Sequence, residues 1–177
     1  IHLLGLQSRC LDVEFFNTRV ETVKNKSRVL FTELCTLVLE TLQKTPAGEV
    51  LQVLVDRQGG RINYRQELMR MFPNFDLSVI GQAENLSSYE MSAGGRLMRI
   101  HFCTRADTKY LPVGLASMTS KYLREVLMEA FNHFFCSRCT DLKPTAGYWK
   151  DGNRFIRDLK ALGPTLAWDT KKLIRVL

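Results

Sequence analysis

The chain has 177 residues, of which 45% are hydrophobic, with a net charge of +7 and a pI of about 9.3. This length suits one domain with a sizeable core, and apolar runs such as Val53–Val55 are far too short to span a bilayer. The excess of positive charge predicts a polyanionic partner, of which nucleic acid is the commonest; an ordinary basic protein is the alternative.

The N-terminal part of the chain opens on a short apolar run, Ile1–Leu6, which predicts a strand. There is no starting Met and no basic segment before the run, so a signal peptide is not indicated, and we expect a chain whose N-terminal part was removed. Asp12 or Asn17 is expected to cap a following helix. Five cysteines, an odd number, indicate reduced thiols and a cytoplasmic protein.

The next segments predict a helix followed by a strand. Apolar residues recur at helical spacing from Val29 to about Lys44, and residues 45–48 (Thr-Pro-Ala-Gly) end the pattern. The β-branched run Val50–Val55 predicts a buried strand inside the sheet, parallel to a neighbour. It ends at Asp56, where open α/β sheets bind ligands, so Asp56 is a site candidate with helix capping as the alternative.

The rest of the chain alternates strands and helices. Short helical spacing at 64–72, stopped by Pro73, is followed by strands at 77–80, 87–91 and 96–103, the last two joined by a turn at 92–95. A long helix at 115–135 is expected to pack across the sheet through Tyr122, Val126 and Phe131. A further helix is expected at 153–162, and residues 168–177 allow another short one.

Several smaller motifs have a structural interpretation beside a functional one. Cys136 and Cys139 form a lone CxxC, for which zinc or redox use is the less favoured interpretation. Gly59-Gly60 and Gly94-Gly95 lack a phosphate-loop pattern and predict turns. His101 is expected to be structural. Basic residues near the last helix predict a solvated face, with a phosphate track as the alternative: Lys150, Arg154, Arg157 and Lys160.

The most informative stretch runs from Asp107 to Lys121 and contains Ala116-Ser117-Met-Thr-Ser-Lys121. It resembles the ribonuclease HII segment in which an Asp precedes a loop and a helix that starts Ala-Ser-x-x-Ala-Lys, here with Ser for the second Ala. In matching order, Val53–Asp56 is similar to the family's strand that ends in its third active-site Asp. Gly147-Tyr148 is similar to the Gly-Tyr that precedes a later helix. The resemblance extends from about residue 12 to residue 162.

The resemblance implies an α/β fold, namely a ribonuclease H-like mixed central sheet flanked by helices. Residues 57–96 would be an inserted helix and β-hairpin. Residues 1–177 would then form a single ribonuclease HII-like domain that lacks its N-terminal strand or strands. The family's first two carboxylates, an adjacent Asp-Glu, are expected on that segment, because Asp12 and Glu14 are interpreted as the start of a helix.

Members of this family cleave the RNA strand of RNA–DNA hybrids, using four carboxylates around two ions of Mg²⁺ or Mn²⁺. The resemblance implies that Asp56 and Asp107 are catalytic residues and metal ligands. It also implies substrate-binding roles near the phosphates and the RNA 2′-OH for Ser117, Lys121, Gly147 and Tyr148.

We therefore predict a metal-dependent endonuclease, expected to be monomeric, whose partner is an RNA–DNA hybrid or another nucleic acid. The chain as given is expected to bind weakly and to cleave poorly or not at all, with half of the carboxylates missing. The alternatives are a non-catalytic nucleic-acid-binding module on the same fold and a basic protein-interaction domain.

Overall fold

The computed structural model describes residues 2–162 and 168–176. Its elements follow in the order α1 (Val13–Val23), α2 (Lys26–Lys44), β1 (Val50–Asp56), α3 (Arg65–Met71), β2 (Asp76–Ala83), β3 (Leu86–Ala93), β4 (Arg96–Cys103), α4 (Ala106–Lys109), α5 (Leu111–Cys136), α6 (Trp149–Ala161) and α7 (Thr170–Leu173). The predicted helices and strands between residues 29 and 162 are confirmed, and their ends shift by a few residues.

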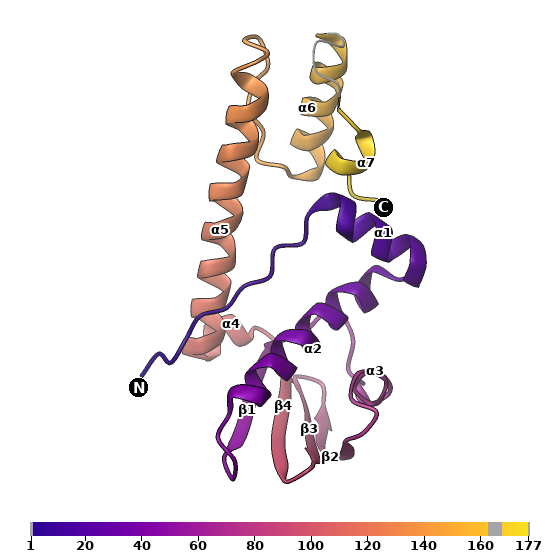
Figure 1. The fold of residues 1–177 in the computed structure, drawn as a ribbon, viewed down its shortest axis with the longest axis vertical. Helices are drawn as coiled ribbons and strands as arrows, with labels where there is room; N and C mark the ends of the chain where they lie inside the picture. The colour runs from indigo at the N-terminus through magenta and orange to yellow at the C-terminus, as the bar shows by residue number, and fades with distance from the viewer. Residues whose placement is uncertain (1, 163–167, 177) are drawn as a thin grey trace.

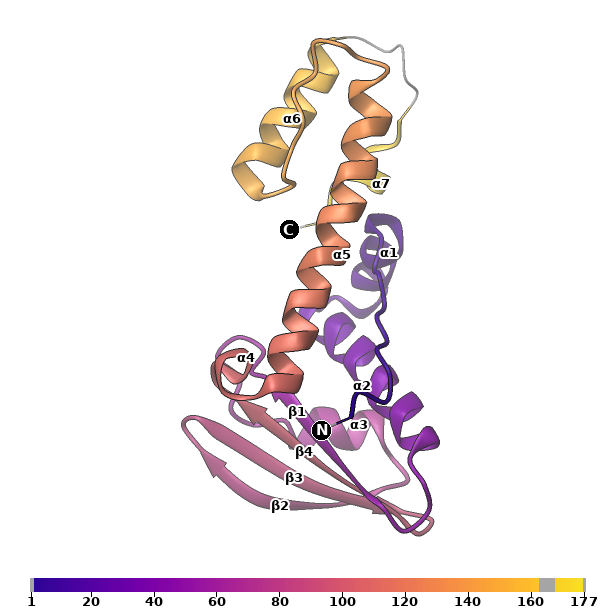
Figure 2. The same ribbon diagram turned by 90° about the vertical axis from the view of Figure 1, so that its left-hand side faces the viewer.

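The described strands form one mixed sheet in the order β1-β4-β3-β2, in which β1 is parallel to β4 and the other pairs are antiparallel (Figure 2). An α/β class with a mixed sheet is therefore confirmed. The turn between β3 and β4 requires glycine, because Gly94 and Gly95 have φ values of 55° and 74°.

The position predicted for β1 is wrong, because among the described strands it lies at the edge of the sheet and not inside it. Its apolar run is explained by one face alone. Leu51 and Val53 pack against the main core, and Val55 is 9% exposed. A run of apolar residues predicts burial of the side chains, but it does not predict a partner for each backbone edge.

The main core lies between the sheet and the helices α2 and α3, which cover one face (Figure 1). Its centre is aromatic: the rings of Tyr64 and Phe102 stack with centroids 3.6 Å apart, and Phe31 of α2 lies 6.0 Å from Tyr64. All three side chains are fully buried. This packing holds the loop after β1 against α2, which matters for the sites below.

The predicted N-terminal strand is wrong. The described part of the segment, residues 2–12, has no regular structure, and Leu4 is 98% exposed. The segment is held by ion pairs, because Arg9 pairs with Glu33 at 2.9 Å and with Glu40 at 3.1 Å, both on α2. Asp12 caps α1, as predicted, by accepting the N–H of Phe15 at 2.8 Å.

Asn17 has a different role from the predicted cap, because it holds the C-terminal segment. Asn17 lies within α1, and its side-chain amide donates to the carbonyls of Lys171 and Ile174 at 3.0 and 2.8 Å. Helix α7 therefore lies beside α1, as the ribbon shows (Figure 1).

Helix α5 does not pack across the sheet, contrary to prediction. Only its first turns meet β1 and α4, and the rest projects beyond the sheet (Figure 2). Tyr122 is 68% exposed and Val126 is 44% exposed. The helix has 26 residues, a length of about 39 Å, whereas the longest strands have 8 residues and span about 27 Å.

Beyond the sheet, α5 pairs with α6 around a second, smaller core. Phe135, Leu142, Phe155 and Leu159 form it, and Phe131 packs against it. Among the described residues, every helix is too short or too polar to cross a membrane.

Candidate functional site

The candidate site begins at the end of β1, where Asp56 meets the segment that follows β4. Its carboxylate Oδ1 accepts the backbone N–H of Ala106 at 2.8 Å, and the N–H of Arg57 donates to Cys103 O at 2.8 Å. Ala106 immediately precedes Asp107. Two aspartates that are distant in the sequence are thus carried on adjoining segments, and both are exposed.

The hydrogen bond from Ala106 also has a structural role. Ala106 is the first residue of α4, whose N-cap, Arg105, lies in the left-handed region at φ 52° and offers no side-chain cap. Asp56 satisfies this helix end in its place. This bond uses only the Oδ1 atom of Asp56, and the second carboxylate oxygen takes no part in it.

Asp107 lines a shallow pocket of about 290 Å³ between α4 and the start of α5. Gly114 permits the close approach of these two helices, because a Cβ there would lie 2.9 Å from the carbonyl oxygen of Asp107. The other lining residues include Tyr110, Leu111, Leu115 and Met118. The pocket contains neither Lys121 nor Tyr148, so it does not gather the predicted site residues into one cleft.

The resemblance implied that Ser117 and Lys121 lie at the N-terminus of a helix, and this is wrong. Helix α5 begins at Leu111, with Pro112 in its first turn, so Ser117 lies in the second turn and Lys121 in the third. The helix dipole acts within the first turn, and it therefore offers little to an anion at these side chains. Ser117 is half-buried and Lys121 is exposed.

Gly147 and Tyr148 lie in a loop that is fastened to α5 and α6. Asn132 of α5 exchanges two hydrogen bonds with the backbone of Thr145, each of 2.8 Å. Asp151 of α6 accepts bonds from the Thr145 hydroxyl, the Ala146 N–H and the Arg154 guanidinium at 2.7, 2.6 and 2.7 Å. The Thr145 bond, followed by those from Arg154 and Ala146, lowers the pKa of Asp151 to about 2.

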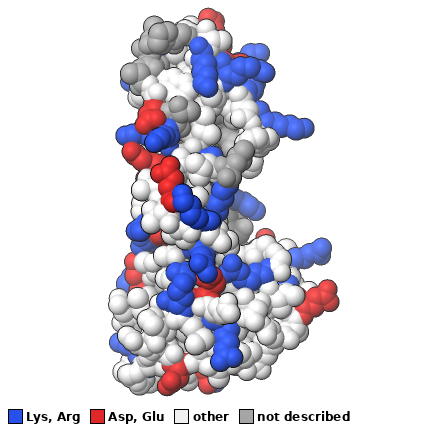
Figure 3. Space-filling view, turned by 90° about the vertical axis from the view of Figure 1, so that its right-hand side faces the viewer, with Lys and Arg blue, Asp and Glu red and all other residues white. Residues whose placement is uncertain are grey.

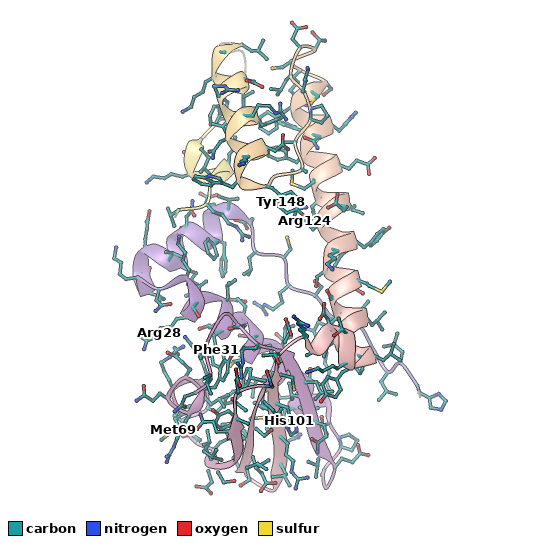
Figure 4. All side chains as sticks on the ribbon, turned by 180° about the vertical axis from the view of Figure 1, so that it is seen from behind. Arg28, Phe31, Met69, His101, Arg124 and Tyr148 are labelled. Carbon is teal, nitrogen blue, oxygen red and sulfur yellow. The ribbon has the colours of Figure 1, made fainter. Side chains whose placement is uncertain are left out.

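The loop presents Tyr148 to solvent with one face of its ring covered. Tyr148 is 65% exposed, and the guanidinium carbon of Arg124 lies 4.4 Å from the centre of the ring (Figure 4). Arg124 also donates to the carbonyl of Ala146. Gly147 is required here, since its φ is 72° and a Cβ would lie 3.1 Å from the sulfur of Met128.

Arg124 and Asp151 are the residues that sequence reasoning missed. A weak signal existed for Arg124, because it follows Lys121 by three residues and so lies on the same side of α5. Asp151 carried no signal, because its role depends on a loop whose path is set by tertiary contacts.

The predicted phosphate track is only partly available. Arg154 pairs with Asp151 and Asp158 and donates to the Pro144 carbonyl at 2.7 Å, and Arg157 pairs with Asp158 at 3.5 Å. These contacts make Arg154 a structural residue, while Lys150 and Lys160 are exposed. On the face drawn in Figure 3, Lys and Arg side chains are spread over most of the height of the molecule, with Asp and Glu side chains among them.

The residues at this site supply too few ligands for a complete metal centre. Carboxylate oxygens such as those of Asp56 and Asp107 suit Mg²⁺. Within residues 2–162 and 168–176, however, no group of three or more His, Cys, Asp or Glu side chains is placed to hold a metal ion.

Asp12 and Glu14 lie at the start of α1, as predicted, where Glu14 pairs with Lys172 at 3.2 Å.

The cysteine pair is also better explained by structure than by metal. All five cysteines are free thiols, and Cys136 and Cys139 pack against the second core.

Comparisons with protein-family models, with curated proteins and with solved structures found no match for this chain, so the resemblance to ribonuclease HII rests on the residues described above.

Proposed function

We propose that the protein acts on nucleic acid as a ribonuclease HII-like endonuclease directed at RNA–DNA hybrids, with Asp56 and Asp107 as two of its metal-binding carboxylates. The observation that carries the proposal is the hydrogen bond between Asp56 and Ala106, which joins the end of β1 to the segment of Asp107. Ligands of open α/β sheets bind at this end of the strands. The net charge of +7 favours a polyanionic substrate.

A divalent ion at Asp56 and Asp107 would offset the negative charge of a bound phosphate. No hydrolytic step follows from two carboxylates alone, and the chain's own residues are assigned to binding. Tyr148 offers its free ring face for stacking against a base or sugar, and Arg124 holds the ring from the other side. Lys121, exposed on the same helix, is assigned a backbone phosphate.

The distance along α5 sets the size of the substrate. Gly114 adjoins Asp107, whereas Arg124 adjoins Tyr148, and these ten steps of the helix span about 15 Å. At about 3.4 Å per nucleotide, a duplex that reaches both places needs about five base pairs or more. Hybrids shorter than that should bind much more weakly than longer ones.

A second candidate is a module on the same fold that binds nucleic acid without cutting it. The specific observation in its favour is that, among the described residues, no group of three or more His, Cys, Asp or Glu side chains is placed to hold a metal ion. Tyr148, Arg124 and Lys121 would act in the same way in this module.

A binding and cleavage assay with the 177-residue chain separates the candidates. A labelled RNA–DNA hybrid and the matching DNA duplex are titrated by fluorescence anisotropy, and the hybrid is then incubated with Mg²⁺ or Mn²⁺. Asp107→Asn is compared with Asp76→Asn, a matched change at an exposed carboxylate on β2.

Cleavage that is lost in Asp107→Asn and kept in Asp76→Asn supports the endonuclease. Without cleavage, hybrid binding that Mg²⁺ strengthens in the wild type but not in Asp107→Asn also supports the endonuclease. Hybrid binding that neither Mg²⁺ nor Asp107→Asn changes supports the module. If the chain binds neither the RNA–DNA hybrid nor the DNA duplex, both proposals are wrong.

A further inference from the structure

The loop between β1 and α3 carries an arginine on each side of a Gln-Gly-Gly sequence. It reads Arg57-Gln58-Gly59-Gly60-Arg61 and begins directly after Asp56. Both glycines are exposed, a Cβ at either would meet nothing within 4 Å, and Gly59 has a φ of 61°. The loop therefore turns sharply and has room to adjust, and this agrees with the turn that the sequence predicts.

The two arginines differ from most others in having buried nitrogens without partners. Nε and Nη2 of Arg57 and Nη1 of Arg61 are shielded from solvent and have no hydrogen-bond partner among the described residues, and the same holds for the acceptor Oε1 of Gln58 between them. A buried guanidinium N–H that lacks an acceptor is unfavourable, because it has lost its water. Neighbouring arginines are satisfied: Arg28 and Arg70 both bind Glu67, at 2.9 Å.

Aromatic rings and a hydroxyl hold the second arginine in place. The guanidinium of Arg61 lies 5.9 Å from the ring centre of Phe31 and 5.6 Å from that of Tyr64, and its Nη2 donates to the Ser27 hydroxyl at 3.3 Å. Phe31 lies between α2 and the sheet, in the main core (Figure 4). A charge that is positioned in this way loses little side-chain freedom when it binds a ligand.

The first arginine lies beside the same tyrosine. The hydroxyl of Tyr64 accepts the N–H of Gln58 at 3.1 Å. Burial raises the pKa of Tyr64, and the Gln58 bond and the positive charges of Arg61 and Arg57 act in the opposite direction. The positive charges of both guanidinium groups therefore act on the Tyr64 hydroxyl.

We propose that Arg57 and Arg61 form a binding site for a phosphate group, which supplies the acceptors that their buried N–H groups lack. Guanidinium groups bind phosphate through paired, charge-assisted hydrogen bonds, and two of them match its several oxygens. Ser27 adds a hydroxyl from the first turn of α2, a turn with no acidic residue. The phosphate is either part of a nucleic-acid backbone or a free phosphate ion.

The test compares the whole chain with two matched variants, Arg57→Met and Arg65→Met. Arg65 is exposed at the start of α3, so this control removes the same charge from the same neighbourhood. Melting temperatures are measured with inorganic phosphate and with chloride at equal ionic strength. The salt dependence of hybrid binding is then measured for each protein.

Phosphate should raise the melting temperature of the wild type and of Arg65→Met, and it should raise that of Arg57→Met much less. In chloride, Arg57→Met should melt above the wild type, because it removes an unpaired buried charge. A backbone phosphate is indicated if Arg57→Met also lowers the slope of log affinity against log salt by about one. An unchanged slope assigns the site to a free phosphate.

Three results would overturn the site: no effect of phosphate on the wild type, an equal effect on Arg57→Met, or a lower melting temperature of Arg57→Met in chloride. The phosphate arm needs no nucleic acid, so its failure is distinct from failure of the proposed function.

Discussion

Replacing Gly147 by alanine tests the geometry that presents Tyr148. At a φ of 72° an alanine is strained by about 1–2 kcal/mol. Its Cβ would also lie 3.1 and 3.2 Å from the sulfur and the methyl carbon of Met128, which form the flexible end of that side chain and can move aside at little cost. We therefore expect Gly147→Ala to lower the free energy of unfolding by about 1–2 kcal/mol.

Gly152 provides a matched control with the opposite expected sign. It lies within α6, and a Cβ there would be 3.8 and 4.0 Å from backbone atoms of Gly147, which is ordinary contact. Alanine is favoured over glycine in a helix by about 1 kcal/mol. Gly152→Ala should therefore raise the free energy of unfolding by up to about 1 kcal/mol.

Urea unfolding followed by tryptophan fluorescence measures both effects. The chain has two tryptophans, and both report on this part of the molecule: Trp149 begins α6, and Trp168 packs against the second core. The reasoning would be refuted if Gly147→Ala were as stable as the wild type, or if both variants shifted stability in the same direction. Hybrid affinity should fall in Gly147→Ala only.

Three further predictions concern single side chains. Asp151 has its pKa lowered from 3.8 to about 2, so its stabilising effect is complete above pH 3.8 and is lost as the pH falls through 2; Asp151→Asn should be less stable at pH 7 and should show a flatter acid limb in fluorescence-detected unfolding. Tyr148→Ala should weaken hybrid binding by about 5- to 150-fold, through the loss of about 1–3 kcal/mol of stacking, whereas Tyr148→Phe should bind nearly as the wild type does in an anisotropy titration. Burial raises the pKa of Cys35 to about 12, so a thiol reagent at pH 8 should label the exposed Cys10 quickly and Cys35 only in unfolded protein, as mass spectrometry would show.

Local pattern was sufficient to predict most elements of the fold. Helical spacing predicts α2, and the β-branched run predicts β1, because each pattern matches the geometry of one element alone. Gly94 and Gly95 mark the turn between β3 and β4, because its backbone needs positive φ values that glycine adopts readily. Where a pattern left its partner unspecified, the prediction failed: β1 is an edge strand, and α5 runs past the sheet.

The candidate site was predictable to a similar degree. Asp56 and Asp107 were singled out by position and by resemblance, and their segments do meet. Arg124 and the pair Arg57 and Arg61 were not, because an arginine acquires its role from the groups around it. Only the fold shows that Arg124 covers Tyr148, or that nitrogens of the other two lie buried without partners.

The central claim is that Asp56 and Asp107 hold a divalent ion against a nucleic-acid backbone. Its most direct test is hybrid affinity measured with EDTA and with Mg²⁺ for the wild type, Asp107→Asn and the control Asp76→Asn. Without metal the carboxylates repel the phosphates, so Asp107→Asn should bind more tightly than the wild type in EDTA. With Mg²⁺ the order should reverse, and Asp76→Asn should follow the wild type in both buffers. An Mg²⁺ effect of equal size in the wild type and Asp107→Asn would contradict the claim.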